Sequence, residues 1–232
     1  VERAERMCGS PVEAVYLGVG GTHVQSQNTR AVVAVTGRGQ EIGPEDVERV
    51  LEAARVITLP PDREILHVLP RQYIVDGYDG VRDPVGMTGS RLEVEAHVVT
   101  AARPALQNLF RTVERAGLEV EEAVFAPLAA AEAVLLEDEK ELGVALADVG
   151  GGTTGVAVYT RGSLAASFVL PAGGEYVTTD IAIGLRTSLA QAEVVKIEHG
   201  WASAALVAED EVFPVPGVAG QGMHRVAAKD LA

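Results

Sequence analysis

Alternating and short apolar runs predict a set of β-strands in the first half of the chain. A strand is expected where β-branched residues recur with period two, or form a short run between polar or glycine-bearing stretches. The predicted strands cover residues 15–19, 31–35, 64–75 and 92–99, and the polar stretch 20–30 is expected to separate the first two. In the last strand Glu93 and Glu95 alternate with apolar residues, so they are expected to face water, with a paired acid–base role as the alternative.

Two amphipathic helices complete this part of the chain. Gly43 and Pro44 have the residue types of a helix N-cap and first turn, and apolar residues then recur at i, i+3, i+4 and i+7. This stripe consists of Val47, Val50, Leu51 and Ala54. The second helix begins at Pro104, ends near Gly117 and has Leu106, Leu109, Phe110 and Val113 on one face. Residues 13–118 are therefore predicted to form β-β-α-β-β-α, a compact α+β unit.

The second half of the chain also predicts strands alternating with helices. The predicted elements are strands at 119–125, 143–147, 156–159 and 167–170, and helices at 127–136, 178–185 (capped by 178–180) and 188–200. The acidic cluster 137–141 is expected to be a solvated link, and Pro214 and Pro216 to mark a loop. Residues 1–9 look like the end of a helix and 226–232 like the start of one, so a fragment of a longer protein is expected.

The charge and residue types exclude several kinds of partner and site. The 232 residues include 19 Lys and Arg against 33 Asp and Glu, a formal net charge of −14, and 47% are hydrophobic. Sequence-independent binding of nucleic acid depends on basic groups that neutralise phosphates, so no nucleic-acid partner is expected. The single Cys8 excludes an internal disulfide, no apolar run approaches the roughly 20 residues of a membrane helix, and the five histidines lack the short spacing of metal ligands.

The strongest candidate for chemistry is the stretch Asp148-Val149-Gly150-Gly151-Gly152-Thr153-Thr154, which lies between two apolar runs. Three glycines can take positive φ and let an anion approach the main chain. Successive amides in such a turn converge on an anion, and Thr153 and Thr154 add hydroxyl donors. Asp148 at the mouth of the turn suggests Mg²⁺ held through water, since a bare carboxylate repels phosphate. The alternative is a glycine-rich hairpin with an Asx turn and no ligand.

This motif resembles the second phosphate loop of the actin, Hsp70 and sugar-kinase superfamily. Within that superfamily the chain is most similar to the FtsA family of bacterial cell-division proteins. The likeness is carried by residues 61–68, 83–89, 106–109 with 113–118, and 180–187, and it extends over essentially the whole chain.

The resemblance implies an α/β protein with an α+β inserted domain, that is, a partial actin-like ATPase fold with the FtsA-type 1C domain. The implied domains are the end of a 1A helix (1–12), 1C (13–118), a 1A segment (119–142), 2A with the phosphate hairpin (143–187) and truncated 2B (188–232). The family's first phosphate loop is expected upstream and its adenosine loop downstream, so this chain is expected to carry about half of a nucleotide site.

The resemblance also extends the site to two further pairs of residues. Glu193 and Lys196 match family residues that contact ribose and adenine, and their i, i+3 spacing places them on one helix face; an exposed ion pair is the alternative. Gly173 and Gly174 match a turn near the phosphates, or form only a strand-to-helix turn. Where the family has a second aspartate this chain has Gly155, which implies slow or negligible hydrolysis of ATP, with Asp148 as the candidate catalytic residue.

The function implied is that of an ATP- and Mg²⁺-binding protein that polymerises and tethers the tubulin-like FtsZ ring to the cytoplasmic membrane at midcell. FtsZ is expected to bind domain 2B, and domain 1C to mediate self-association and recruit later division proteins. Membrane binding is expected only through a C-terminal helix that this chain lacks. The alternatives are a pilus-assembly ATP-binding adaptor of the same superfamily and a small-molecule kinase.

Overall fold

The computed structural model describes residues 1–208, 210–217 and 222–231. The chain forms two compact units: residues 1–148 with 154–170, and residues 149–153 with 171–232. Each unit has its own buried apolar core. No helix in the described residues is long and apolar enough to cross a membrane.

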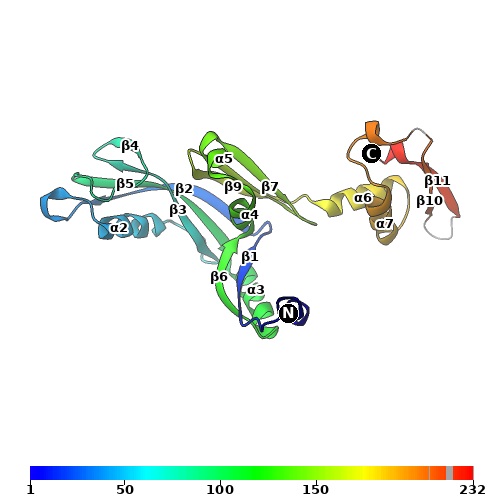
Figure 1. The fold of residues 1–232 in the computed structure, drawn as a ribbon, viewed down its shortest axis with the longest axis horizontal. Coiled ribbons are helices and arrows are strands. Elements are labelled where there is room, and N and C mark those ends of the chain that lie inside the picture. The colour runs from blue at the N-terminus through cyan, green and yellow to red at the C-terminus, as the bar shows by residue number, and fades with distance from the viewer. Residues whose placement is uncertain (209, 218–221, 232) are drawn as a thin grey trace. The chain divides into compact units, whose positions relative to one another are not determined.

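A four-stranded sheet organises the first unit. Its strands are β2 (Val24–Ala34), β5 (Arg91–Ala102), β3 (Arg63–Val75) and β4 (Tyr78–Val81), in the order β2-β5-β3-β4. All neighbouring strands are antiparallel. Helix α2 (Pro44–Arg55) runs along one face of the sheet (Figure 1). Its predicted stripe is confirmed, because Val50 and Ala54 are buried against Leu92 and Val94 of β5.

The prediction that β5 is half-solvated is wrong. β5 is the central long strand, and nearly all of its residues are buried. Glu93 is only 3% exposed and pairs with Arg30 at 2.7 Å and with Arg91 at 3.0 Å. Two arginines therefore replace the water that an alternating pattern predicts, since a buried carboxylate needs such partners.

Strand β2 is longer than its apolar run. It begins at Val24, so most of the stretch expected to be a link is strand paired with β5 along its whole length. Its polar side chains make hydrogen bonds to another strand: Ser26 donates to the Ser167 carbonyl at 2.5 Å, and Asn28 donates to the Ala165 carbonyl at 3.2 Å. The short strand β4 was also not expected; it follows a turn at Asp76 and Gly77, both with positive φ.

The rest of the first unit surrounds this sheet. The other elements are α1 (Glu2–Cys8), β1 (Ala14–Val19), a 3₁₀ turn (Arg38–Gln40), α3 (Arg103–Arg115), β6 (Glu119–Phe125), α4 (Ala126–Val134), α5 (Glu137–Leu142), β7 (Val144–Val149), β8 (Thr154–Thr160) and β9 (Ser163–Leu170). β1 and β6 form a parallel pair, and β7, β8 and β9 a second sheet. The sequence predicted the start of α3 to within one residue and both ends of β6.

The acidic cluster 137–141 is a helix, α5, and not a solvated link. Lys140 is buried on the inner side of this helix, and its ammonium lies 2.9 Å from the carboxylates of both Glu132 and Glu137. These two ion pairs allow Lys140 to be buried. The acidic composition of the cluster did not indicate a buried residue.

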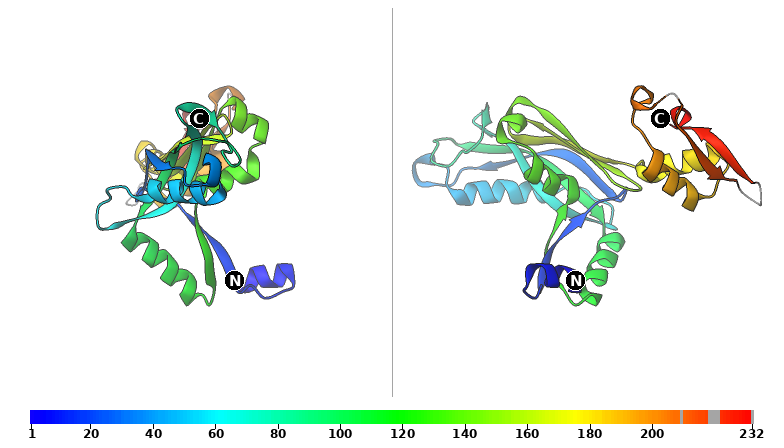
Figure 2. Two further views of the ribbon diagram at one scale, coloured as in Figure 1. Left: turned by 90° about the vertical axis from the view of Figure 1, so that its left-hand side faces the viewer. Right: turned by 45° about the vertical axis from the view of Figure 1, so that its right-hand side comes forward.

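The second unit contains α6 (Gly174–Gly184), α7 (Leu189–His199), β10 (Val212–Pro216), β11 (Met223–Ala227) and two 3₁₀ turns (Ala204–Leu206 and Ala228–Asp230). Figure 2 shows the helix pair beside the two strands. Their shared core includes Ile181, Val195, Phe213 and Val215. Residues 209, 218–221 and 232 of the predicted 2B segment lie outside the described residues.

Three boundaries in this unit differ from prediction. Helix α6 begins at Gly174, so Thr178 lies inside the helix instead of capping it. Pro214 and Pro216 lie in β10 and not in a loop. β10 and β11 form a two-stranded sheet, so one edge of β10 has no neighbouring strand among the described residues. A proline whose missing N–H would face that edge removes no hydrogen bond between strands. Residues 228–230 form a 3₁₀ turn where the beginning of a helix was expected.

Candidate functional site: a glycine loop held by two helices

Residues 150–153 form the turn that connects β7 to β8, as predicted. The amide of Gly150 donates to the Thr153 carbonyl at 2.9 Å and closes the turn. Contrary to expectation, none of these three glycines has a left-handed φ. At Gly150 close packing matters, because a Cβ would lie 3.1 Å from the Thr153 carbonyl oxygen.

The N-terminus of α6 holds this loop. The amides of Gly174 and Glu175 donate to the carbonyls of Gly150 (3.0 Å) and Gly151 (2.8 Å). A Cβ on Gly173 would lie 2.5 Å from both carbonyl oxygens. Only glycine therefore allows the helix to start this close to the loop.

Two amides of the loop remain available to a ligand. Gly151 and Gly152 are exposed, and their N–H groups make no hydrogen bond within the described part of the chain. The amide of Gly150 does not belong to this set, since Thr153 accepts from it. Adjacent free amides in a tight turn are donors suited to an anion.

Carboxylates lie near this loop or next to it in sequence. Oxygens of Glu175 are 3.6 and 3.7 Å from where Cβ atoms on Gly151 and Gly152 would be. Asp148 is exposed and, like Thr154, belongs to the first unit. A phosphate here needs a cation to offset the nearby acidic charge, so the donor set fits an anion accompanied by Mg²⁺.

Glu193 and Lys196 of α7 form an ion pair of 2.7 Å, which confirms that they share one helix face. The Lys196 ammonium also donates to the Gly174 carbonyl at 3.2 Å and to the Thr178 hydroxyl at 2.8 Å, and Thr178 donates to Glu193. These hydrogen bonds, that of Lys196 first, hold the pKa of Glu193 below its ordinary value. The pair is more than an isolated surface ion pair, because it ties α7 to the start of α6.

One continuous network thus joins most of the residues predicted for the site. The network runs from the loop carbonyls through the start of α6 to α7, and includes Gly150, Gly151, Thr153, Gly174, Glu193 and Lys196. Sequence reasoning missed Thr178 and Glu175. Their positions near the loop result from the start of α6 at Gly174. Glu175 lies in the first turn of this helix, and Thr178 lies one turn after Gly174.

Packing explains why glycine stands at position 155. Gly155 is buried in β8, and a Cβ there would lie 2.3 Å from Cγ of Pro127 in α4. Any larger residue, an aspartate included, would require α4 or β8 to move.

His97 lies away from the loop in a buried polar cluster. Its Nδ1 is 2.6 Å from Oδ1 of Asn28, and its Nε2 is 2.8 Å from Oγ of Ser167. The arrangement resembles a nucleophile triad, but His97 and Ser167 are 2% and 6% exposed. Burial lowers the pKa of His97 to about 4, with a smaller contribution from Arg71. The cluster joins β2 and β5 to β9 and offers no access to a substrate.

Comparison with known proteins identifies the family. The sequence model of the SHS2 domain inserted in FtsA matches residues 21–100, and that of cell division protein FtsA matches residues 145–232. The chain is 42% identical over its whole length to cell division protein FtsA of Pseudomonas aeruginosa. This chain belongs to the FtsA family. It is also 49% identical to FtsA of Bacillus subtilis over 92% of its length.

The chain spans about half the length of these FtsA relatives, 55% and 49% respectively. A solved structure titled as the PilM–PilN type IV pilus biogenesis complex is similar with a TM-score of 0.59 at 20% identity, over 81% of this chain and 51% of that one. At this identity the likeness concerns the fold alone. The expected fold class is confirmed: mixed α/β, partial actin-like, with the inserted domain of FtsA.

Proposed function

We propose that the full-length protein is an actin-like, ATP-binding division protein that polymerises and links the FtsZ ring to the inner face of the cytoplasmic membrane. The observation that carries this proposal is identity of about 40–50% with FtsA proteins over nearly all of the chain. The same identity favours division over the pilus-adaptor and kinase alternatives, since the pilus protein is similar only in fold.

ATP would use the glycine loop. The free amides of Gly151 and Gly152 would donate to phosphate oxygens, and the hydrogen bonds from α6 that hold the loop support this role. Thr153 and Thr154 would add hydroxyls, and Asp148 would hold Mg²⁺ through water. When bound, the ion would offset the negative charge of the phosphates beside the carboxylates of Asp148 and Glu175. Glu193 and Lys196 would contact the nucleoside from α7.

Binding of ATP is tested on the full-length protein by calorimetry with Glu193→Gln, using Glu198→Gln of the same helix as the matched control. Glu198 is exposed and has no ion pair with a described residue. Loss of one charged hydrogen bond to the nucleoside should weaken ATP binding about ten-fold. Equal affinities of the two variants would assign Glu193 a purely structural role.

The domain and partner assignments belong to the same proposal. Residues 13–118 would be domain 1C, which mediates self-association and recruits later division proteins. Residues 119–142 would belong to 1A, 143–187 to 2A, and 188–232 to 2B with part of the FtsZ-binding surface. Membrane binding would depend on a helix outside this chain.

Turnover of ATP is expected to be slow, because position 155 carries no carboxylate to orient water. Release of phosphate by the full-length protein with Mg²⁺ and ATP measures this directly, and rapid turnover would overturn it.

Co-sedimentation with FtsZ filaments, compared with phosphotransfer to sugars, separates the division role from a kinase. Phosphotransfer without co-sedimentation would refute the division role.

A further inference from the structure

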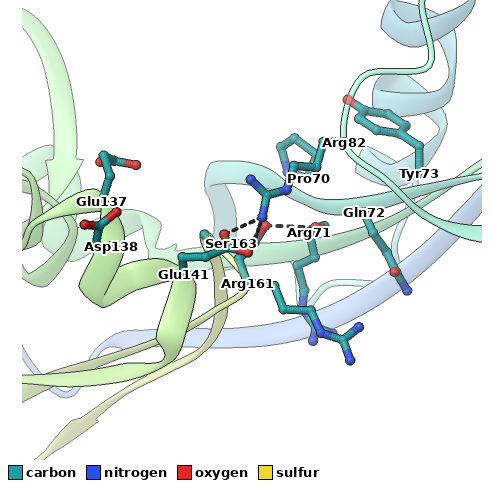
Figure 3. A pocket seen from close by; sticks show the side chains of 11 residues that line it. Pro70, Arg71, Gln72, Tyr73, Arg82, Glu137, Asp138, Glu141, Arg161 and Ser163 are labelled. Carbon is teal, nitrogen blue, oxygen red and sulfur yellow. Dashed lines mark hydrogen bonds and ion pairs between the residues drawn. The ribbon is translucent and has the colours of Figure 1, made fainter.

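The turn between β8 and β9, at the end of β8 opposite to the glycine loop, forms one wall of a polar cavity. A hollow of about 400 Å³ is lined by Arg71, Gln72, Thr160, Arg161 and Ser163. It adjoins a second hollow of about 380 Å³ that shares four of these residues and extends toward Arg82 and α5 (Figure 3). All of the side chains come from the first unit.

Two guanidinium groups in this cavity lack a counter-charge. Arg71 and Arg161 make no side-chain hydrogen bond or ion pair with the described residues. Arg82, in contrast, is paired with Glu141. Cationic groups that line a hollow without a partner are suited to bind an anion.

The acidic residues around the cavity do not neutralise these arginines. Glu137 is paired with Lys140 at 2.9 Å. Figure 3 shows Glu137 and Asp138 on the side of the cavity away from Arg71 and Arg161. Glu95 accepts a hydrogen bond from Gln72 at 2.8 Å and does not line either hollow. The hollow of about 400 Å³ has no lining residue from α5, and among the described residues the only charged side chains that line it are the two arginines.

The backbone holds both arginines in place. Arg161 has a φ of 53° and Gly162 a φ of 74°, and their amides donate to the carbonyls of Glu141 (3.2 Å) and Lys140 (3.0 Å) at the end of α5. The Ser163 hydroxyl donates to the Arg71 carbonyl at 2.9 Å and links β9 to β3. A left-handed conformation is uncommon for a residue with a Cβ, and here docking of the turn on α5 stabilises it.

We propose that Arg71 and Arg161 bind a phosphate-sized dianion in this cavity. Guanidinium groups recognise phosphate and carboxylate oxygens with paired N–H donors. The formal net charge of −14 opposes general accumulation of anions on the protein, so binding here would depend on these two side chains. The site lies on elements other than the glycine loop and is independent of the proposed binding of ATP.

The test uses inorganic phosphate with the full chain, and reads hydrogen exchange of peptides that cover residues 158–166. Bound phosphate should slow exchange at this turn with a saturable dependence on concentration. Arg71→Gln combined with Arg161→Asn should weaken the response at least ten-fold. Asparagine tolerates left-handed φ, so the turn should be retained, and its intact exchange without phosphate verifies this. Arg111→Gln, an exposed arginine on α3, is the matched control.

Succinate, titrated in parallel, distinguishes a dicarboxylate from a tetrahedral oxyanion as the preferred ligand chemistry. The same dependence on phosphate in the double variant and in Arg111→Gln would overturn the proposal. Absence of a saturable response in the unmodified protein would also overturn it. Phosphate bound at the glycine loop would not depend on Arg71 or Arg161, so the difference between the double variant and Arg111→Gln is separate from the outcome for ATP.

Discussion

Around the glycine loop, glycine is required where two segments of backbone meet. The glycine loop was expected to need glycine for positive φ, yet Gly150, Gly151 and Gly152 avoid the left-handed region. Glycine is required instead at Gly173, where α6 begins against the loop carbonyls. Sequence suggested that Gly173 lies in a turn, but the atoms that a side chain would strike belong to residues more than twenty positions earlier.

Gly173→Ala is predicted to destabilise the second unit by about 1–3 kcal/mol, because the methyl group would overlap two carbonyl oxygens that cannot both move. Urea denaturation measures the change in free energy of unfolding. Gly184→Ala in the same helix is the matched control, since no atom of the described residues lies within 4 Å of its Cβ position. This control should be neutral or slightly stabilising, and an equal loss in both variants would contradict the argument.

Gly155 and Pro127 are predicted to be energetically coupled. Gly155→Ala alone should cost about 1–3 kcal/mol through its overlap with Pro127 Cγ. Pro127→Ala removes that atom and leaves Cβ at an ordinary 3.6 Å from the new methyl group. The double variant should therefore recover more than 0.5 kcal/mol relative to the sum of the single variants, which a double-mutant cycle measures. Additive effects would show that the contact is relieved by other movements.

Helices α6 and α7 differ in how well their boundaries were predicted. Helix α7 has a local signal, because the Ser188 side chain accepts from the amide of Gln191 at 3.2 Å. Helix α6 lacks one: its N-cap is Gly173, with no side-chain cap, and its first amides bond to the glycine loop. A helix whose cap is supplied by a distant segment carries no start signal in its own sequence.

The link between these helices is predicted to depend on the Thr178 hydroxyl. Thr178→Val keeps the shape but removes the group between Glu193 and Lys196, and should cost about 1–3 kcal/mol. Thr179→Val is the matched control, because Thr179 is exposed and, among the described residues, its hydroxyl bonds only to the Glu175 carbonyl one turn earlier. Its effect should stay within about 0.5 kcal/mol. Thermal unfolding compares the two variants, and similar melting temperatures would refute the role of Thr178.

Across the first unit, His97 joins two sheets in a way that depends on pH. Its pKa is lowered to about 4 in the folded state from an ordinary value of 6.5, mainly by burial. Between these values the unfolded chain binds the proton and the folded chain does not. The contribution of His97 to stability is therefore complete above pH 6.5 and is lost as the pH falls toward 4.

The free energy of unfolding is predicted to fall by about 2–3 kcal/mol more in the unmodified protein than in His97→Gln between pH 7 and pH 4.5. Urea denaturation followed by circular dichroism at both pH values measures this difference. The control is His224→Gln, in the second unit, which should keep the pH dependence of the unmodified protein. Identical pH profiles for His97→Gln and the unmodified protein would rule out a role for His97 in this dependence.

Local signals were enough to predict much of the fold and the centre of the site. The stripe of α2, the proline start of α3, the cap of α7 and the glycine turn after β7 were each identified from a few neighbouring residues. These features depend on interactions within one or two helical turns or one hairpin, so the order of residues determines them. The resemblance carried by the same stretches then led to the correct family.

The tertiary structure determined those features that depend on contacts between residues far apart in the sequence. The burial of Glu93 depends on Arg30 and Arg91, and the polar start of β2 on carbonyls of β9. The start of α6 depends on the glycine loop, and the glycine at position 155 on a proline in α4. In each case the energy of a polar or crowded position is set by what packs against it, and hydrophobic periodicity along one segment contains no information about that neighbour.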